Sequence, residues 1–371
     1  MRKICGFVNL FNSPELGPLT EKRNFGSVTF LGRYGLIDFA LSNFTNSGIN
    51  RVGIIVNKFP NSIRSHVQNG SAFTINTKTG YLGVLYNEQH ERKDTHNDVT
   101  TIKATRTHYD IVEDSDYVVI APAHLLMCMD FYPIIREHIA SEKDVTVVYE
   151  HRFDLDKEFK GANLLSIGNK KAKFLKKNDQ KEKEGFVCLD TYILSRHFFD
   201  EILEEHVNIN EKYGLNDMIK FMVNKSRKEM NAHEYNGFVL PVTSLDNYIK
   251  GSFFLLSYLN RIKLIKDGWP IYTATHNTPP ARYGPKANVK NSFIANGSII
   301  NGTVENSILS REVIVSQGAS VKNSIVFTKT EIAKGASLNF VLTDKTAYIG
   351  EKASISGTKK EYFIIKQGAK I

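Results

Sequence analysis

The chain has 371 residues, of which 42% are hydrophobic and 23% charged, and its formal net charge is +9 at pH 7. This length predicts two or three domains, and the composition excludes fibrous and disordered proteins. The most apolar stretch, residues 117–135, is interrupted by two prolines, a histidine and an aspartate, so we expect no membrane-spanning helix, which would need about 20 mainly apolar residues.

The first 245 residues alternate short β-branched runs with helical patterns. The apolar runs are Ile4–Leu10, Val52–Asn57, Tyr117–Ala121 and Val145–Glu150, and the helical patterns are Pro60–Gln68, Thr101–Ile111 and Phe131–Ser141. Nearly continuous apolar runs are typical of strands buried on both faces of a parallel sheet. This rhythm predicts a Rossmann-like α/β domain with binding sites at the carboxyl ends of its strands.

The densest basic stretch, Lys170–Lys183, bears on whether the positive charge serves a nucleic acid. Clustered lysines neutralise phosphates and supply most non-specific affinity for nucleic acids. This stretch, however, contains Asp179 and Glu182, and Phe174 is its only aromatic residue. A single-strand platform needs several stacking rings. We therefore expect a solvated loop and no nucleic-acid partner.

A longer helix and a linker follow the α/β domain. Apolar residues recur at helical spacing over Leu245–Ile265, and the Pro-rich segment Asn277–Arg282 comes after it. Prolines in such a cluster mark irregular connections. We assign residues 246–287 to this helix and linker.

Internal repeats fill the C-terminal part. The segments Val315–Val321, Ile332–Leu338 and Ile349–Ile355 start 17 residues apart, and each has a branched apolar residue at both ends. Such hexapeptide periods build a parallel β-helix, in which three short strands form a coil of about 18 residues. We predict this fold for residues 288–371, with a β-sandwich that has coincidental Gly-Ala-Ser turns as the alternative.

The three cysteines, Cys5, Cys128 and Cys188, are far apart in the sequence and form no Cys-x-x-Cys unit. Neither a disulfide framework nor a zinc site is indicated. We expect a reduced protein of the cytoplasm.

One block is specific enough to indicate a family. Residues Gly32–Val56 resemble the corresponding block of the glucose-1-phosphate adenylyltransferases, also called ADP-glucose pyrophosphorylases, and Trp269-Pro-Ile with Pro279-Pro-Ala281 is similar to that family's approach to its C-terminal domain. The resemblance implies a GT-A-like nucleotidyltransferase domain over residues 1–245 and a left-handed parallel β-helix after it. It also implies the family reaction, in which ATP and glucose 1-phosphate give ADP-glucose for glycogen or starch, with release of pyrophosphate.

The sequence departs from the family at the positions that carry this chemistry. The family's glycine-rich phosphate loop is missing from residues 11–20, and Phe25 stands where the family's Arg-x-Lys-Pro motif has lysine. The two aspartates that bind magnesium in the family correspond to Ala123, which precedes His124, and to Pro241. Because a metal ion supplies several kcal/mol of transition-state stabilisation, its loss should slow the reaction roughly a thousandfold. We therefore expect no catalytic residue and no metal site in this chain.

Within the family, such departures resemble the GlgD-type subunit, which assembles with a catalytic subunit and modulates it. This resemblance implies a regulatory, catalytically impaired chain in a heterotetramer, with a homo-oligomer as the alternative for the chain alone and with Mg²⁺ bound by the catalytic partner. Two other hypotheses remain open: an active sugar-phosphate nucleotidyltransferase with altered metal ligands, and a stand-alone protein that senses a sugar phosphate or a nucleotide.

Three basic residues at family positions are candidates for anion binding. Lys177 corresponds to the lysine that grips the phosphate of glucose 1-phosphate, although its neighbours differ from the family motif. Arg23 and Arg33 lie where the family places cations that face phosphates or an effector. The alternatives are a solvated lysine for Lys177 and surface ion pairs for the arginines. We interpret His124 as a hydrogen-bonded residue at a strand end rather than as a catalyst.

Overall fold

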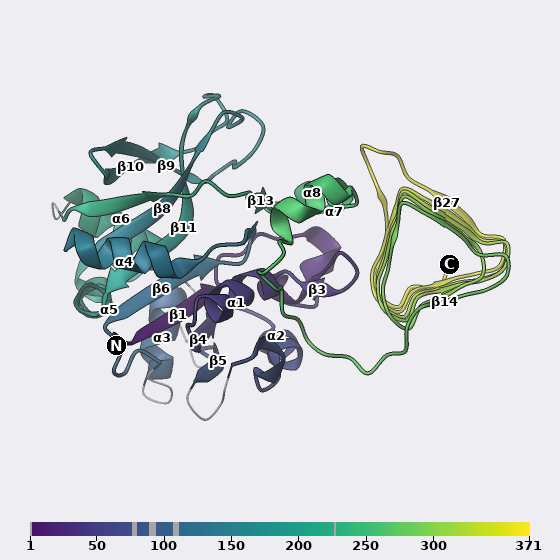
Figure 1. The fold of residues 1–371 in the computed structure, drawn as a ribbon, viewed down its shortest axis with the longest axis horizontal. Coiled ribbons are helices and arrows are strands. Elements are labelled where there is room, and N and C mark those ends of the chain that lie inside the picture. The colour runs from purple at the N-terminus through teal and green to yellow at the C-terminus, as the bar shows by residue number, and fades with distance from the viewer. Residues whose placement is uncertain (1, 76–79, 89–93, 107–110, 226–227) are drawn as a thin grey trace.

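The computed structural model describes residues 2–75, 80–88, 94–106, 111–225 and 228–371. It consists of an α/β domain, two helices beside it, and a triangular prism of short strands at the C-terminal end (Figure 1). Within these residue ranges no helix combines the length and the apolar character needed to cross a membrane.

A nine-stranded mixed sheet forms the centre of the first domain. Its strands, in spatial order, are β5 (Tyr81–Leu85), β4 (Arg51–Ile55), β1 (Ile4–Asn9), β6 (Tyr117–Pro122), β11 (Gly185–Ser195), β8 (Val145–Arg152), β12 (Met230–Glu234), β10 (Lys171–Lys177) and β9 (Asn163–Gly168). The four strands predicted from sequence are β1, β4, β6 and β8. These four strands run in the same direction, as predicted, whereas β11, which the sequence analysis did not identify, runs antiparallel between β6 and β8.

Helices cover both faces of this sheet. They are α1 (Ile37–Asn46), α2 (Pro60–Val67), α3 (Asp98–Arg106), α4 (Phe131–Ser141), α5 (Arg196–Asn210) and α6 (Leu215–Lys225). The predicted helix over 101–111 begins earlier, at Asp98, and its residues 107–110 lie outside the described ranges. Side chains of β1 alternate between the two faces: Phe7 stacks on Phe199 of α5, whereas Val8 belongs to the cluster on the other face, with Phe39 of α1. The sheet therefore separates two apolar cores.

Short elements complete the first domain. They are the strands β2 (Thr29–Phe30), β3 (Tyr34–Gly35), β7 (Leu125–Leu126) and β13 (Leu240–Pro241), and the 3₁₀ turns Gly17–Thr20, Phe25–Ser27 and Ser71–Phe73. β13 pairs with β7, and β2 pairs with β3.

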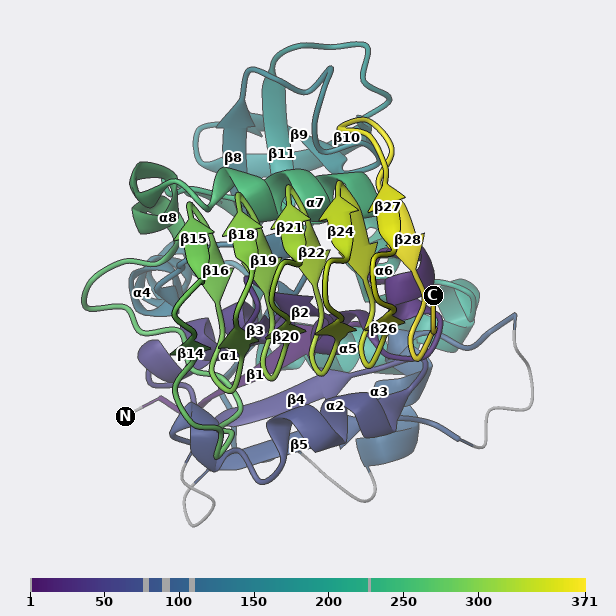
Figure 2. The ribbon, with the colours of Figure 1, turned by 90° about the vertical axis from the view of Figure 1, so that its right-hand side faces the viewer.

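The single long helix predicted after residue 245 is two helices, α7 (Leu245–Phe254) and α8 (Tyr258–Leu264). The chain turns between them at Leu255 and Leu256, and both side chains are buried. The helical path ends at the N-cap of α8, Ser257, whose backbone is extended (φ −64°, ψ 129°). α7 lies along the outside of the prism (Figure 2).

Three parallel five-stranded sheets make the prism, with the architecture of a left-handed β-helix (Figure 1). One sheet contains β14 (Arg282–Tyr283), β17 (Ile299–Ile300), β20 (Ile314–Val315), β23 (Glu331–Ile332) and β26 (Tyr348–Ile349). The second contains β15 (Asn288–Lys290), β18 (Thr303–Glu305), β21 (Ser320–Lys322), β24 (Ser337–Asn339) and β27 (Ser354–Ser356). The third contains β16 (Phe293–Ile294), β19 (Ile308–Leu309), β22 (Ile325–Val326), β25 (Val341–Thr343) and β28 (Phe363–Ile365).

The repeats explain the stacking of these coils. Val304, Val321 and Leu338 occupy the same register in successive coils and are all fully buried. At one corner Asn306 donates to Asn323 (2.6 Å), and Asn323 donates to Asn339 (3.0 Å). Asn306 and Asn323 both have φ of +47°, a conformation that asparagine tolerates better than most residues. Aliphatic stacks inside and asparagine ladders at the corner therefore set the prism.

A buried ion pair joins the two domains. Arg23 donates two hydrogen bonds to the carboxylate of Asp344, at 2.8 and 2.9 Å, and a third to Gln367 at 3.1 Å. The Arg23 and Asp344 side chains are only 6% and 4% exposed. Because neither charge is in contact with water, removal of one residue would leave the charge of the other buried without a partner or solvent.

We expect Arg23→Met to lower the free energy of unfolding by about 3–5 kcal/mol, since it leaves the Asp344 carboxylate buried without its partner. Urea denaturation measures this loss. The double variant Arg23→Met/Asp344→Leu should recover most of it. As a control, Lys366→Met breaks an exposed pair with Glu21 and should cost less than about 1 kcal/mol. An Arg23→Met loss no larger than that of Lys366→Met would contradict the assignment.

Candidate functional site

The two positions that the sequence analysis matched to the family's magnesium ligands lie on neighbouring segments. Ala123 follows β6, and Pro241 ends β13, which pairs with β7 so that Pro241 faces Leu125. The amide of Val242 donates to the carbonyl oxygen of His124 at 2.8 Å. Neither side chain carries a metal-ligating atom. Within the described ranges, no three His, Cys, Asp or Glu side chains gather as a metal site would require.

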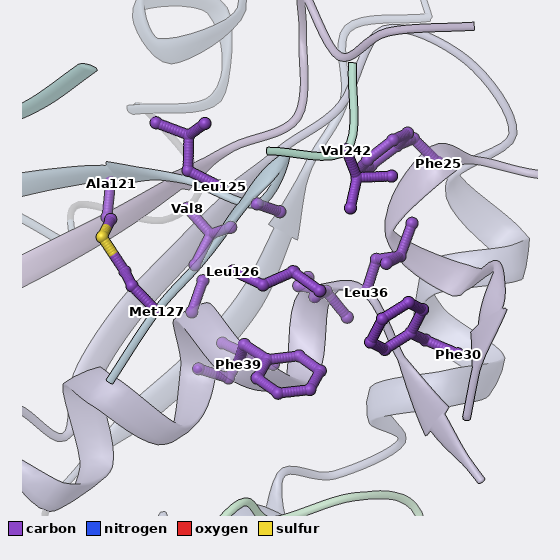
Figure 3. Packing of buried hydrophobic residues seen from close by; sticks show 14 of the residues in the cluster. Val8, Phe25, Phe30, Leu36, Phe39, Ala121, Leu125, Leu126, Met127 and Val242 are labelled. Carbon is purple, nitrogen blue, oxygen red and sulfur yellow. The ribbon is translucent and has the colours of Figure 1, made fainter. Parts of the chain in front are cut away.

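Apolar packing fills the neighbourhood of these positions. Ala123, Phe25 and Val242 all belong to one buried cluster, in which Phe25 is 3% exposed. Figure 3 shows the Phe25 ring beside Val242 and close to Leu36. A ring packed this way contributes about 1.5–3 kcal/mol to folding but offers no charge to a phosphate. The residues present at this edge of the sheet therefore do not fit a magnesium ion with a bound triphosphate.

One buried carboxylate near this edge escaped the sequence analysis. Asp98 accepts hydrogen bonds from the side chain of Asn9 at the end of β1 (2.7 Å) and from the amides of Val99 (2.9 Å) and Leu215 (2.7 Å). Burial raises the pKa of Asp98. Its oxygens are engaged by neighbouring groups, so it ties α3 and α6 to β1. An aspartate at the start of a helix is a recognisable capping pattern, but the predicted helix began three residues after Asp98, so this pattern was not noticed.

Lys177 and His124 lie beside the strands β9 and β6, which pair with the same edge of β11, opposite β8. Lys177 ends β10, is exposed, and pairs in register with Asn163 of β9. Burial lowers the pKa of His124 to about 4, so its ring is neutral near pH 7. Its Nε2 atom lies 3.9 Å from a carboxylate oxygen of Asp190. His124 therefore sits at a strand end, near a carboxylate but beyond hydrogen-bonding distance.

A basic cavity lies between the first domain and the β-helix. Two adjoining cavities, of about 380 and 520 Å³, share lining residues Arg33, Tyr34, Ala274, His276 and Arg311. The smaller one is also lined by Arg23, His66, Lys329 and Lys345, and Glu312 is the only carboxylate side chain that lines either cavity. The combined charge of the side chains that line the two cavities is therefore strongly positive.

The cations of this cavity differ in how they are paired. Arg23 is hydrogen-bonded to Asp344. Arg33 is exposed, and its guanidinium carbon lies 5.7 Å from the centroid of the Tyr34 ring. Burial, together with the charge of Arg33, lowers the pKa of Arg311. Burial and the charge of Arg23 lower the pKa of Lys345. Crowded, partly dehydrated cations are stabilised by an anion among them.

Sequence analysis identified Arg23 and Arg33 as candidates for anion binding, and the structure brings both to this cavity. Lys177 lies apart from it, on β10. Arg311 and Lys345 were missed, because they come from coils of the β-helix and no spacing links them to the first domain. Only the packing of the two domains brings them together with Arg33.

Comparisons with known proteins agree with this architecture. Residues 14–238 match the family model described as nucleotidyl transferase, and residues 279–362 match one described as GlmU-like, C-terminal hexapeptide. A glucose-1-phosphate adenylyltransferase of Fervidobacterium nodosum is 28% identical over 96% of this chain and 82% of its own length. One from Clostridium perfringens is 28% identical over 86% of this chain and 82% of its own length.

A differently named relative has similar coverage. The glycogen biosynthesis protein GlgD of Bacillus subtilis is 26% identical over 95% of this chain and 92% of its own length. The nucleotidyl transferase match alone covers more than half of the chain. The chain therefore belongs to the nucleotidyl transferase family, as a homologue of the glucose-1-phosphate adenylyltransferases and of the glycogen biosynthesis protein GlgD.

Proposed function

We propose that the chain is a regulatory, catalytically impaired subunit of ADP-glucose pyrophosphorylase. It assembles with the catalytic subunit, in a heterotetramer, and modulates the synthesis of ADP-glucose from ATP and glucose 1-phosphate for glycogen biosynthesis. Mg²⁺ belongs to the catalytic partner, and this chain binds none.

One observation supports this proposal above the others. The two positions at which the family holds magnesium lie on adjacent segments, and they carry Ala123 and Pro241. Attack at the α-phosphorus develops charge that a metal ion normally neutralises. Phe25 also stands where the family has a cation, and it is buried in the apolar core of the domain. A chain that keeps the family fold but lacks carboxylates at the two metal positions is suited to act through a partner.

The basic cavity supports the regulatory part of the proposal. Its cations come from both domains, so an anion bound there contacts the α/β domain and the β-helix at once. A ligand shifts a conformational equilibrium only through a difference in its contacts between two states. We therefore propose that a sugar phosphate or a nucleotide acts as effector here.

The first prediction concerns turnover. With Mg²⁺, ATP and glucose 1-phosphate, the purified chain alone should turn over roughly a thousandfold more slowly than its catalytic partner, because it lacks both metal carboxylates. Co-expression of the two chains should shift the maximal rate or the substrate affinity of the partner. ADP-glucose synthesis by each chain alone and by the mixture measures both effects.

Two results would contradict this proposal in different ways. Robust metal-dependent turnover by the chain alone would indicate an active nucleotidyltransferase with other metal ligands. An unchanged partner, together with no co-purification of the two chains, would indicate a stand-alone sensor of phosphorylated ligands.

The second prediction concerns the cavity. Inorganic phosphate should raise the melting temperature of the chain, and Arg311→Gln should weaken the apparent phosphate affinity at least about tenfold, since one charge-assisted hydrogen bond is worth about 1.5–3 kcal/mol and about 1.4 kcal/mol is tenfold. Lys345→Gln should act in the same direction. Lys334→Gln removes an exposed β-helix lysine outside the cavity lining and serves as the matched control. Equal responses of Arg311→Gln and Lys334→Gln would exclude the cavity as the phosphate site.

A further inference from the structure

Four polar side chains form a line across the edge of the main sheet. Lys177 of β10 is paired with Asn163 of β9, and β9 pairs in turn with β11 through Leu164 and Val187. Further along the same edge of β11, Tyr192 pairs with Ile120 of β6, while β8 pairs along the opposite edge. Asp190 is two residues before Tyr192, so it lies beside the end of β6, which His124 follows. The order along this edge is Lys177, Asn163, Asp190, His124.

Asp190 has an unusual backbone conformation. It lies in an irregularity of the ladder between Cys188 and Thr191, and its φ is +47°. Aspartate and asparagine enter this left-handed region more readily than most non-glycine residues. The irregularity breaks the regular alternation of side chains on β11, so the face taken by the Asp190 side chain is not fixed by its neighbours.

The surroundings of this carboxylate hold opposing influences. Burial raises the pKa of Asp190 to about 6, while hydrogen bonds from Cys188, Tyr192 and Asn163 and the positive charge of Lys177 favour its ionised form. The His124 ring, 3.9 Å away, is neutral near pH 7. At that pH the line therefore contains one cation, Lys177, and one anion, Asp190. Their charges cancel.

We propose that Asp190 is a built-in counter-ion for Lys177, and that it closes this edge of the sheet to phosphorylated sugars. A phosphate approaching Lys177 meets the negative charge of Asp190 in a partly dehydrated setting, where repulsion between like charges is strong. Anionic ligands are thereby directed to the cavity between the domains, where the cations that line it outnumber the carboxylates. This inference goes beyond the proposed function, because it concerns ligand binding by the isolated chain and needs neither turnover nor a partner.

Binding of glucose 1-phosphate to the full-length chain tests the proposal by calorimetry. Asp190→Asn removes the charge and keeps a residue that tolerates positive φ, and it should bind glucose 1-phosphate at least tenfold more tightly than the unmodified chain. Asp190→Gly removes the charge and the backbone strain together, and it should show the same gain. Adding Lys177→Gln to Asp190→Asn should abolish the gain, whereas adding Arg311→Gln should leave it intact.

Asp179→Asn is the matched control. Asp179 is a carboxylate of the same lysine-rich segment and contacts Lys176 and Lys181, so its removal changes the net charge equally. It should change the affinity less than twofold. Circular dichroism melts confirm that each variant is folded.

The other outcomes each overturn the proposal. Weaker binding by Asp190→Asn would make Asp190 an acceptor for sugar hydroxyls. An equal gain in Asp179→Asn would reduce the effect to overall charge. A gain lost with Arg311→Gln rather than with Lys177→Gln would place the binding in the cavity between the domains. No gain in either Asp190 variant would show that this carboxylate is not what keeps the ligand out.

Discussion

The bidentate pair between Arg23 and Asp344 sets the relation of the two domains on which the basic cavity depends. It joins residues 321 positions apart in the sequence and excludes water from both charges. Because each charge would be unsolvated without the other, the β-helix is held in one position against the α/β domain. That position brings Arg311 and Lys345 to the wall that Arg33 already occupies. The same pair neutralises the charge of Arg23, so Arg23 is not available to bind an anionic ligand. Arg33, Arg311 and Lys345 therefore carry the net charge of the cavity.

The edge of the sheet and the cavity between the domains have opposite electrostatic character. At the edge, Ala123, Phe25 and Val242 belong to the apolar core of the domain, and the positive charge of Lys177 is opposed by the negative charge of Asp190. In the cavity, Arg311 and Lys345 are partly dehydrated and lie near other cations. An enzyme of this family needs charge at the edge, where phosphoryl chemistry takes place. Here the uncompensated charge lies between the domains, where binding can alter their packing.

Hydrophobic and repeat patterns in the sequence predicted several strands of the main sheet and the β-helix. Strand direction, the break between α7 and α8 and the contacts between domains depend on tertiary structure. The 17-residue spacing of Val315, Ile332 and Ile349 was sufficient for the β-helix, because each coil repeats the same burial. Direction within a sheet leaves no trace in an apolar run, so the antiparallel β11 was not predicted. The break between α7 and α8 lies at the extended Ser257, whereas the apolar periodicity continues through it. Arg23 was correctly singled out, but its partner Asp344 lies in another domain and no local signal connects them.

Asp190 illustrates the limit of motif comparison. Comparison with the family motifs identifies Lys177 as retained and shows which motif residues around it are missing. It does not reveal a carboxylate that has been added near Lys177, because an aspartate in a strand without a matching motif is not distinguished from other polar residues. The positive φ and the alignment of four strands become visible only in the fold. A binding site can be lost by gain of a counter-charge as well as by loss of a ligand, and the first route leaves the original cation in place. Retention of Lys177 is therefore not by itself evidence that the sugar-phosphate site still works.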